Sequence, residues 1–178
     1  MKMRCFISLG IEDRLKQNIF EIQRKFKFPG VKLVDKNLLH ITVKFLGSID
    51  LREVNSIISY LDEIKQKAFK VHARSIGVFP SKNNIRVIWI GIYSETLIDL
   101  VKEIYSDLNW DFEFKPHITI ARIKNTPQLN KKSILKNIEY LRNCSVGEFW
   151  IKDIKLLESK LTSAGPIYSV VYNKKLGK

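Results

Sequence analysis

Two short stretches decide how this chain folds: HITVKFLG at residues 40–47 and HITIARI at residues 117–123. Each opens with His-Ile-Thr and an apolar residue, and their histidines stand 77 positions apart. Successive side chains of a β-strand point to opposite faces, so each His shares a face with the Thr two positions later. The intervening apolar residues point to the other face. Both stretches are therefore predicted to be strands that carry a polar pair over an apolar backing.

The segments around these strands recur in the same order, a helix before each motif and a helix after it. Helical apolar spacing predicts helices over 12–28 and 94–109 before the motifs, and over the segments from 51 onward and 127–142 after them. Asp50 with Glu53, and Ser94, are expected to cap two of these helices. Gly47 is expected to end the first motif strand. Further strands are predicted over 3–9, 68–79, 85–92, 146–161 and 166–172, with 68–79 and 85–92 as a hairpin.

This order predicts an internal duplication with two lobes around a pseudo-two-fold axis. The fold class is then α+β, with two pseudo-symmetric lobes of mostly antiparallel sheet, helices outside and a central cleft. We expect residues 1–178 to form one bilobal domain, because the length suits two small lobes that share a core.

The composition is that of a folded, basic protein. The chain has 178 residues, 45% of them hydrophobic, with a net charge of +13 and an isoelectric point near 9.7. Apolar runs such as 87–90 are far too short for a membrane span, and the first residues do not resemble a signal peptide, so a cytoplasmic location is expected. Cys5 and Cys144 form no metal or redox pair and are expected to be small buried residues.

The positive charge favours polyanionic partners, since Lys and Arg gain counterion-release free energy on binding phosphates. Nucleic acid is the leading candidate. Compositional bias or adaptation to high temperature would also produce a lysine-rich chain, so charge alone does not decide the partner. The basic residues are spread along the sequence, and any phosphate-binding surface has to be assembled by folding.

The two motifs carry a chemistry that one copy would not suggest. If the strands lie side by side, His40 and His117 face each other, and one imidazole can accept a proton while the other donates one. The hydroxyls of Thr42 and Thr119 can bind a phosphate oxygen. These groups suit displacement at a phosphodiester without a metal or other cofactor. A metal site is the alternative, but the motifs contain no carboxylate or Cys pair. His72 lacks the Thr partner and is expected to lie on a strand face.

The motifs resemble the paired H-x-T-x signatures of the 2H phosphoesterase superfamily, and more closely the LigT-like family of archaeal and bacterial RNA 2′,3′-cyclic phosphodiesterases. The resemblance extends over MRCFISLGI, GVFP, IRVIWIGI and SKLTSAGPIY. It implies the bilobal LigT-like fold, with hydrolysis of an RNA 2′,3′-cyclic phosphate to a 2′-phosphate and 2′-5′ joining of RNA ends as a related activity. It also implies that His40 and His117 are the acid-base pair and that Thr42 and Thr119 hold the phosphate.

The family pattern further implies roles for residues five positions beyond each histidine, Phe45 for stacking on a base and Arg122 for binding phosphate. Five is an odd number, so a β-bulge or a strand end is needed to turn both side chains into the cleft. Otherwise Phe45 belongs to the core and Arg122 is a solvated charge. Tyr168 and Arg86 are additional candidates for substrate binding, with structural roles as the alternative.

Three functions are compatible with these observations. The first is the metal-independent cyclic phosphodiesterase acting on RNA ends, with tRNA fragments among the candidate substrates. The second is a non-catalytic module that binds RNA ends, and the third is a hydrolase of a small cyclic phosphate such as ADP-ribose 1″,2″-cyclic phosphate. The motifs are chemically equivalent, so the sequence does not tell which histidine is the acid. A monomer is expected.

Overall fold

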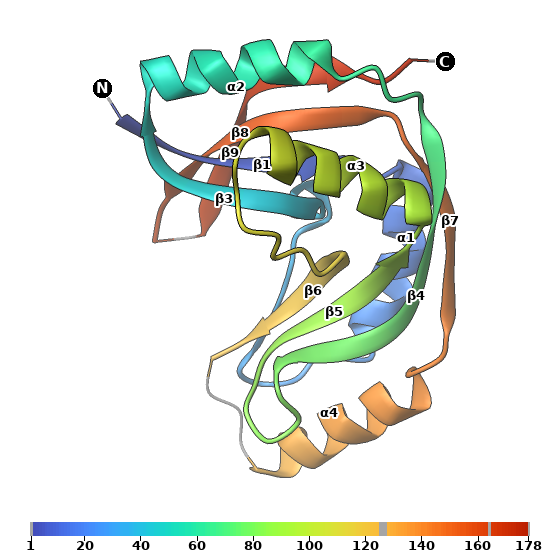
Figure 1. The fold of residues 1–178 in the computed structure, drawn as a ribbon. Helices are drawn as coiled ribbons and strands as arrows, with labels where there is room; N and C mark the ends of the chain where they lie inside the picture. Colours follow the sequence, from blue (N-terminus) through green and yellow to red (C-terminus); the bar gives the residue numbers. More distant parts are fainter. Residues whose placement is uncertain (1, 125–127, 164, 178) are drawn as a thin grey trace.

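The computed structural model of the chain describes residues 2–124, 128–163 and 165–177 (Figure 1). Nine strands, four α-helices and one 3₁₀ turn follow one another in these residues. In chain order they are β1 (Lys2–Leu9), α1 (Asp13–Arg24), β2 (Val31–Leu33), the 3₁₀ turn (Lys36–Leu38), β3 (Ile41–Asp50), α2 (Leu51–Glu63), β4 (Phe69–Pro80), β5 (Ile85–Tyr93), α3 (Glu95–Asp107), β6 (His117–Ile123), α4 (Gln128–Tyr140), β7 (Ser145–Ile151), β8 (Asp153–Leu161) and β9 (Pro166–Lys175).

The strands form one curled sheet in which all the pairings between strands are antiparallel. The order is β7-β4-β5-β6-β3-β1-β8-β9, and β2 pairs with β6. We call β3, β1, β8 and β9 the terminal lobe, and β6, β5, β4, β7 and β2 the central lobe. The lobes meet where β3 and β6 pair, and that pairing has a single register position, Ile41 with Ile118. The predicted α+β class and bilobal antiparallel architecture are confirmed.

The lobes are not the two halves of the sequence. The terminal lobe takes its strands from both ends of the chain, and the central lobe takes its strands from the middle. The predicted strand over 146–161 is therefore wrong. It is two strands separated at Lys152, because β7 lies at the edge of the central lobe beside β4, whereas β8 pairs with β1 in the terminal lobe.

The helices lie outside the sheet, and two of them cover the lobe opposite to that of the strand they follow. Helix α1 packs on β7 and β6 of the central lobe, although it follows β1. Helix α3 lies with α2 over the terminal lobe, although it connects β5 to β6 (Figure 1). This exchange places each of these helices beneath the motif strand of the opposite lobe.

Local signals set the ends of the helices. Asp50 and Glu53 form the predicted capping box of α2, and the Ser94 hydroxyl accepts the expected hydrogen bond from Leu97 N. The predicted helices over 12–28 and 94–109 are shorter in the structure. The first ends at Arg24 because the chain continues in i to i+3 turns, which still bury Phe26. Pro127, expected to begin the last helix, lies outside the described residues.

The strand prediction also needs one correction at Gly47. Strand β3 does not end there but runs on to Asp50, pairing with β1 along the way. Gly47 pairs with Cys5 and has a φ of +72°. The next residue of β1, Phe6, pairs with Phe45, so the register shifts beside Gly47. The positive φ of the glycine is therefore used inside the strand, at this irregularity. Cys5 is buried as predicted, whereas Cys144 is half-buried. No helix among the described residues is long and apolar enough to cross a membrane.

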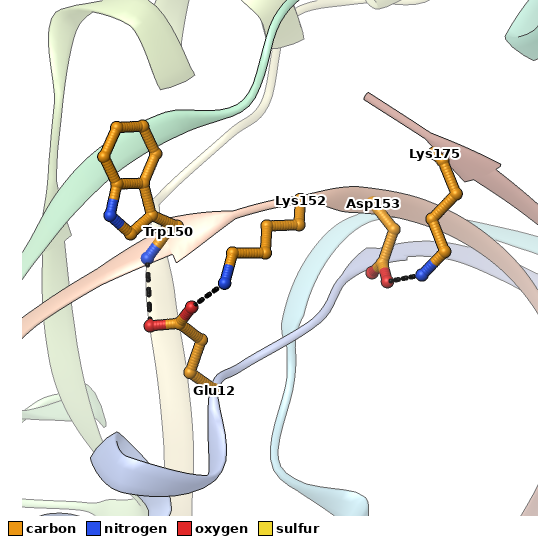
Figure 2. A network of polar contacts seen from close by, with 5 residues as sticks. All are labelled: Glu12, Trp150, Lys152, Asp153 and Lys175. Carbon is orange, nitrogen blue, oxygen red and sulfur yellow. Dashed lines mark hydrogen bonds and ion pairs between the residues drawn. The ribbon is translucent and has the colours of Figure 1, made fainter. Parts of the chain in front are cut away.

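Polar contacts surround two of the places where the chain passes from one lobe to the other, after β1 and between β7 and β8 (Figure 2). Glu12, at the start of α1, accepts hydrogen bonds from the Trp150 backbone N–H and from Lys152 Nζ. Lys152 is the residue between β7 and β8, and the next residue, Asp153, pairs with Lys175 of β9. The hydrogen bond from Lys152 is the main cause that lowers the pKa of the Glu12 carboxyl.

Replacing Glu12 tests the contribution of this network. Because the pKa of Glu12 is lower in the folded state, its stabilisation is present above the ordinary glutamate pKa of about 4.3 and is lost as the pH falls through the folded value. We expect Glu12→Gln to lower the free energy of unfolding by about 0.5–1 kcal/mol at pH 7, with the difference vanishing in acid. Urea denaturation at several pH values measures it; a difference that persists unchanged at pH 3 contradicts it.

Candidate active site

The seam between the lobes brings the two motifs together. His40 immediately precedes β3, His117 is the first residue of β6, and the paired residues are their neighbours Ile41 and Ile118. Antiparallel pairing at this position places each histidine next to the threonine of the other motif. Thr42 and His117 accordingly line one cavity, of about 550 Å³. The prediction that the two motif strands lie side by side is confirmed.

Both imidazoles are held by the same local contact. Nδ1 of His40 lies 2.6 Å from the carbonyl oxygen of Leu38, and Nδ1 of His117 lies 2.6 Å from that of Lys115. A carbonyl can only accept, so each Nδ1 carries a hydrogen and donates it. In the neutral ring Nε2 is then the basic nitrogen. Nε2 of His40 is 3.0 Å from the Thr42 hydroxyl, which donates to it.

A β-bulge follows the threonine in each motif, which is one of the two features that the five-residue spacing predicted. In β3, Thr42 pairs with Ser8 but Lys44 pairs with Ile7, so Val43 is the extra residue. In β6, Thr119 pairs with Trp89 but Ala121 pairs with Ile88, so Ile120 is the extra residue. Each bulge shifts the alternation of side chains between the two faces of the sheet by one position. Phe45 is thereby turned to the face of His40, and Arg122 to the face of His117.

Buried polar side chains donate to the carbonyls of both bulged residues, and the Ile120 carbonyl also accepts a hydrogen bond from the Val34 backbone N–H. The hydroxyl of Tyr105, on α3, donates to the Val43 carbonyl at 2.8 Å. The amide of Gln23, on α1, donates to the Ile120 carbonyl at 2.7 Å and also to the Val34 carbonyl. Tyr105 and Gln23 are 2% and 3% exposed. Each exchanged helix thus fixes the bulge of one motif.

Aromatic rings surround His40. The ring of Phe6 lies 5.1 Å from His40, 5.7 Å from Phe45 and 4.9 Å from Tyr168, measured between centroids. The Tyr168 ring meets His40 edge-on at 5.5 Å. Phe45 is 64% exposed, so it is not a core residue. The structure therefore gathers two of the additional candidates, Phe45 and Tyr168, around the first histidine.

Burial and one arginine set the electrostatics of the site. Burial is the main cause that lowers the pKa of both His40 and His117, and the positive charge of Arg122 lowers both further. His117 adds a smaller lowering of the pKa of His40. Arg122 also acts on Tyr168, whose pKa is raised by burial. The positive charge of Arg122 therefore acts on all three rings, although its side chain is exposed.

The remaining predicted residues lie farther from the motifs. Arg86 is exposed at the far end of β5, donates to the Lys124 carbonyl, and does not line the cavities that the histidines line. His72 is an exposed residue of β4 that pairs with Glu148, in line with its predicted position on a strand face. Among the residues that the structure describes, no three His, Cys, Asp or Glu side chains are grouped to hold a metal ion.

Three aromatic residues of the site were not predicted, although they stand in the stretches MRCFISLGI, GVFP and IRVIWIGI that resemble the family. Phe6 and Trp89 come from strands adjacent to the motif strands, and Phe79 comes from one strand farther out. The rings of Phe79 and Trp89 lie 5.1 and 6.4 Å from His117. Their contact with a histidine depends on strand order and register, which the sequence alone does not provide. A buried polar residue on an apolar helix face, Gln23, was a usable signal.

The comparisons with known proteins agree with this fold and these motifs. The family model described as LigT like Phosphoesterase matches residues 9–89 and 91–168. The RNA 2′,3′-cyclic phosphodiesterase of Methanocaldococcus jannaschii is 42% identical over 95% of this chain and 98% of its own. The protein of that name from Aquifex aeolicus is 35% identical over 98% of each. The crystal structure of TT0787 from Thermus thermophilus superimposes with a TM-score of 0.84 at 25% identity, covering 99% of this chain and 100% of its own.

A curled antiparallel sheet with two His-x-Thr strands paired at its centre defines a two-histidine phosphoesterase. The family model covers most of the chain, and the relatives exceed 30% identity over nearly their whole length. The chain belongs to the LigT-like phosphoesterase family, as the motifs predicted.

Replacing Tyr105 tests the support of the first bulge. Tyr105→Phe leaves the buried Val43 carbonyl without its donor, so we expect the free energy of unfolding to fall by about 1–2 kcal/mol. Tyr140→Phe, at a tyrosine that is 79% exposed, is the matched control and should leave stability unchanged. Urea denaturation monitored by circular dichroism measures both. Equal stability of the two variants would show that the hydrogen bond does not hold the bulge.

Replacing Arg122 tests the electrostatics. Its positive charge lowers the pKa of both histidines, so Arg122→Gln should raise both values and shift their protonation to higher pH. Arg142→Gln removes an exposed arginine that pairs with Glu139 and should leave both values unchanged. NMR titration of the imidazole ring protons measures them. Unaltered titration of His40 and His117 in Arg122→Gln would contradict the placement of the guanidinium.

Proposed function

We propose that the protein hydrolyses RNA 2′,3′-cyclic phosphate ends to 2′-phosphates by acid-base catalysis between His40 and His117. The observation that carries the proposal is the pairing of the two motifs, each with Nδ1 bound to a carbonyl and Nε2 left for proton transfer. The full-length relatives named RNA 2′,3′-cyclic phosphodiesterase support the same reaction.

In the proposed reaction one neutral imidazole accepts a proton from water as the water oxygen attacks phosphorus. The bond between phosphorus and the 3′-oxygen breaks, and the other imidazole, protonated, gives its proton to that oxygen. The 2′-phosphate is the product. A 5′-hydroxyl of RNA in place of water would give a 2′-5′ linkage by the same proton transfers. Both proton transfers use side chains of the protein, and no step of the proposed reaction uses a metal.

Phosphate binding accounts for the remaining polar groups. The Thr42 hydroxyl, which donates to His40 Nε2 at 3.0 Å, can turn to a phosphate oxygen and release that nitrogen for catalysis. Thr119 is the corresponding residue of the other motif, and Arg122 supplies a positive charge for the non-bridging oxygens. A bound anion offsets the effect of Arg122 on the imidazole pKa values, which favours the one protonated ring that the reaction needs.

Base recognition is assigned to the aromatic rings around His40. Phe45 is exposed and rests against buried Phe6, which leaves one of its faces for stacking. Tyr168 lies at the other side of Phe6 and can contact the ribose or the base. The net charge of +13 supports attraction of an RNA backbone. Arg86, at the far end of β5, remains a candidate for contact with more distant phosphates.

The test is incubation of the purified protein, in EDTA, with a short oligoribonucleotide that ends in a 2′,3′-cyclic phosphate. We expect a 2′-phosphate product, and a loss of about 10²–10⁴-fold in kcat/KM in His40→Ala and in His117→Ala. His72→Ala is the matched control, because His72 is exposed and pairs with Glu148, and it should retain activity.

The outcomes separate the candidate functions. RNA binding without turnover would favour the non-catalytic module that binds RNA ends. Turnover of ADP-ribose 1″,2″-cyclic phosphate in preference to RNA would favour the small-molecule hydrolase. Activity that survives both active-site substitutions, or that EDTA abolishes, would refute the two-histidine mechanism.

A further inference from the structure

A second aromatic surface lies on the opposite side of the histidine pair from Phe6, Phe45 and Tyr168. Those three come from β1, β3 and β9 of the terminal lobe. Phe79 on β4 and Trp89 on β5 come from the central lobe, and their rings pack together at 5.2 Å beside His117. One terminal base needs only one stacking surface, so the second is available to another group of the substrate.

This surface opens into a large cavity. The space is about 1010 Å³, and Phe79, Trp89, Tyr93 and His117 all line it. It is therefore roomier than the cavity of about 270 Å³ next to His40, and large enough for a nucleoside. The indole Nε1 of Trp89 is buried and has no hydrogen-bond partner among the described residues. This nitrogen is packed away from solvent, whereas the ring as a whole is half-buried, so the cavity meets the ring of Trp89 and not this donor.

Two glycines within the strands shape the cavity. A Cβ at Gly77 would lie 2.1 Å from the Trp89 ring, so the indole rests directly on the backbone of β4. A Cβ at Gly91 would lie 2.9 Å from the Tyr93 ring and 3.0 Å from the Arg74 carbonyl oxygen. Glycine inside a strand often marks a close approach by another group. Gly77 leaves room for the Trp89 indole against β4, and the cavity lies beside the indole.

Charged groups at the cavity fit a nucleotide. The guanidinium of Arg74 lies 4.2 Å above the Tyr93 ring, and Lys115 Nζ lies 6.0 Å from the Phe79 ring centroid. Lys102 also lines the space. These cations suit a backbone phosphate. Two carboxylates, Glu95 and Asp99, line the same cavity and can accept hydrogen bonds from ribose hydroxyls or base amino groups.

We infer that the surface formed by Phe79 and Trp89 binds the nucleotide that precedes the cyclic end. The inference rests on the proposed function. With the cyclic phosphate between the histidines and the terminal base at Phe45, the preceding nucleotide enters the central lobe, where its base stacks on Trp89. Two nucleotides are then bound on opposite sides of the seam, and the enzyme prefers an RNA end to a mononucleotide.

The test compares a nucleoside 2′,3′-cyclic monophosphate with a trinucleotide that has the same cyclic terminal nucleotide. The measured quantity is the ratio of kcat/KM for the trinucleotide to kcat/KM for the mononucleotide. We expect a ratio well above one in the wild type. Trp89→Leu removes a stacked ring and should lower the ratio at least about fivefold, whereas Trp89→Phe keeps an aromatic face and most of the preference. Tyr140→Leu, at an exposed position on α4, should leave the ratio unchanged.

A wild-type ratio near one, or an unchanged ratio in Trp89→Leu, overturns the inference. If the wild type hydrolyses neither substrate, the proposed function fails, and the nucleotide site is tested by binding alone. A trinucleotide with a 3′-phosphate is then titrated into the wild type, Trp89→Leu and Tyr140→Leu. A dissociation constant raised at least about fivefold only in Trp89→Leu supports the site. Equal constants overturn it. Circular dichroism of each variant verifies that it is folded.

Discussion

The bulges at Val43 and Ile120 are the constraint on which the rest of the structure depends. A regular strand would turn Phe45 and Arg122 away from the histidines, and one extra residue in each strand turns them back. A bulge displaces a carbonyl from the ladder, and a buried carbonyl without a donor costs about 1–3 kcal/mol. Tyr105 supplies the donor at Val43, and Gln23 adds a donor to the Val34 N–H at Ile120.

The same two hydrogen bonds explain why α1 and α3 cover the opposite lobes. Each helix follows a strand of one lobe and buries its polar residue under the motif of the other, so each lobe completes the other's active strand. The lobes share one register pair at the seam, and each of these helices also reaches the motif strand of the opposite lobe through its buried polar residue. Their relative position, and with it the spacing of the two imidazoles, is therefore coupled to the packing of both helices.

The sequence predicts the elements better than their arrangement. Strand alternation, helical spacing and the caps at Asp50 and Ser94 are local, and most elements follow them within a few residues. The bulges were one of two predicted ways, the other being a strand end, by which the five-residue spacing could turn Phe45 and Arg122 into the cleft. The break at Lys152 was not predicted, because it depends on which lobe each strand joins. Phe6, Phe79 and Trp89 were missed for the same reason: strand order brings them to the histidines.

The electrostatics of the site favour one protonation state of the two histidines, and acid-base catalysis needs another. Burial and Arg122 together favour neutral imidazoles, whereas an acid-base pair at work needs one ring protonated and one not. In the proposed function Arg122 attracts the phosphate, and the same positive charge disfavours protonation of the rings. An anion bound at Arg122 screens that charge from both histidines, so binding itself moves the pair toward its working form. In the proposed reaction, recognition of the phosphate and readiness for proton transfer then depend on the same ion pair.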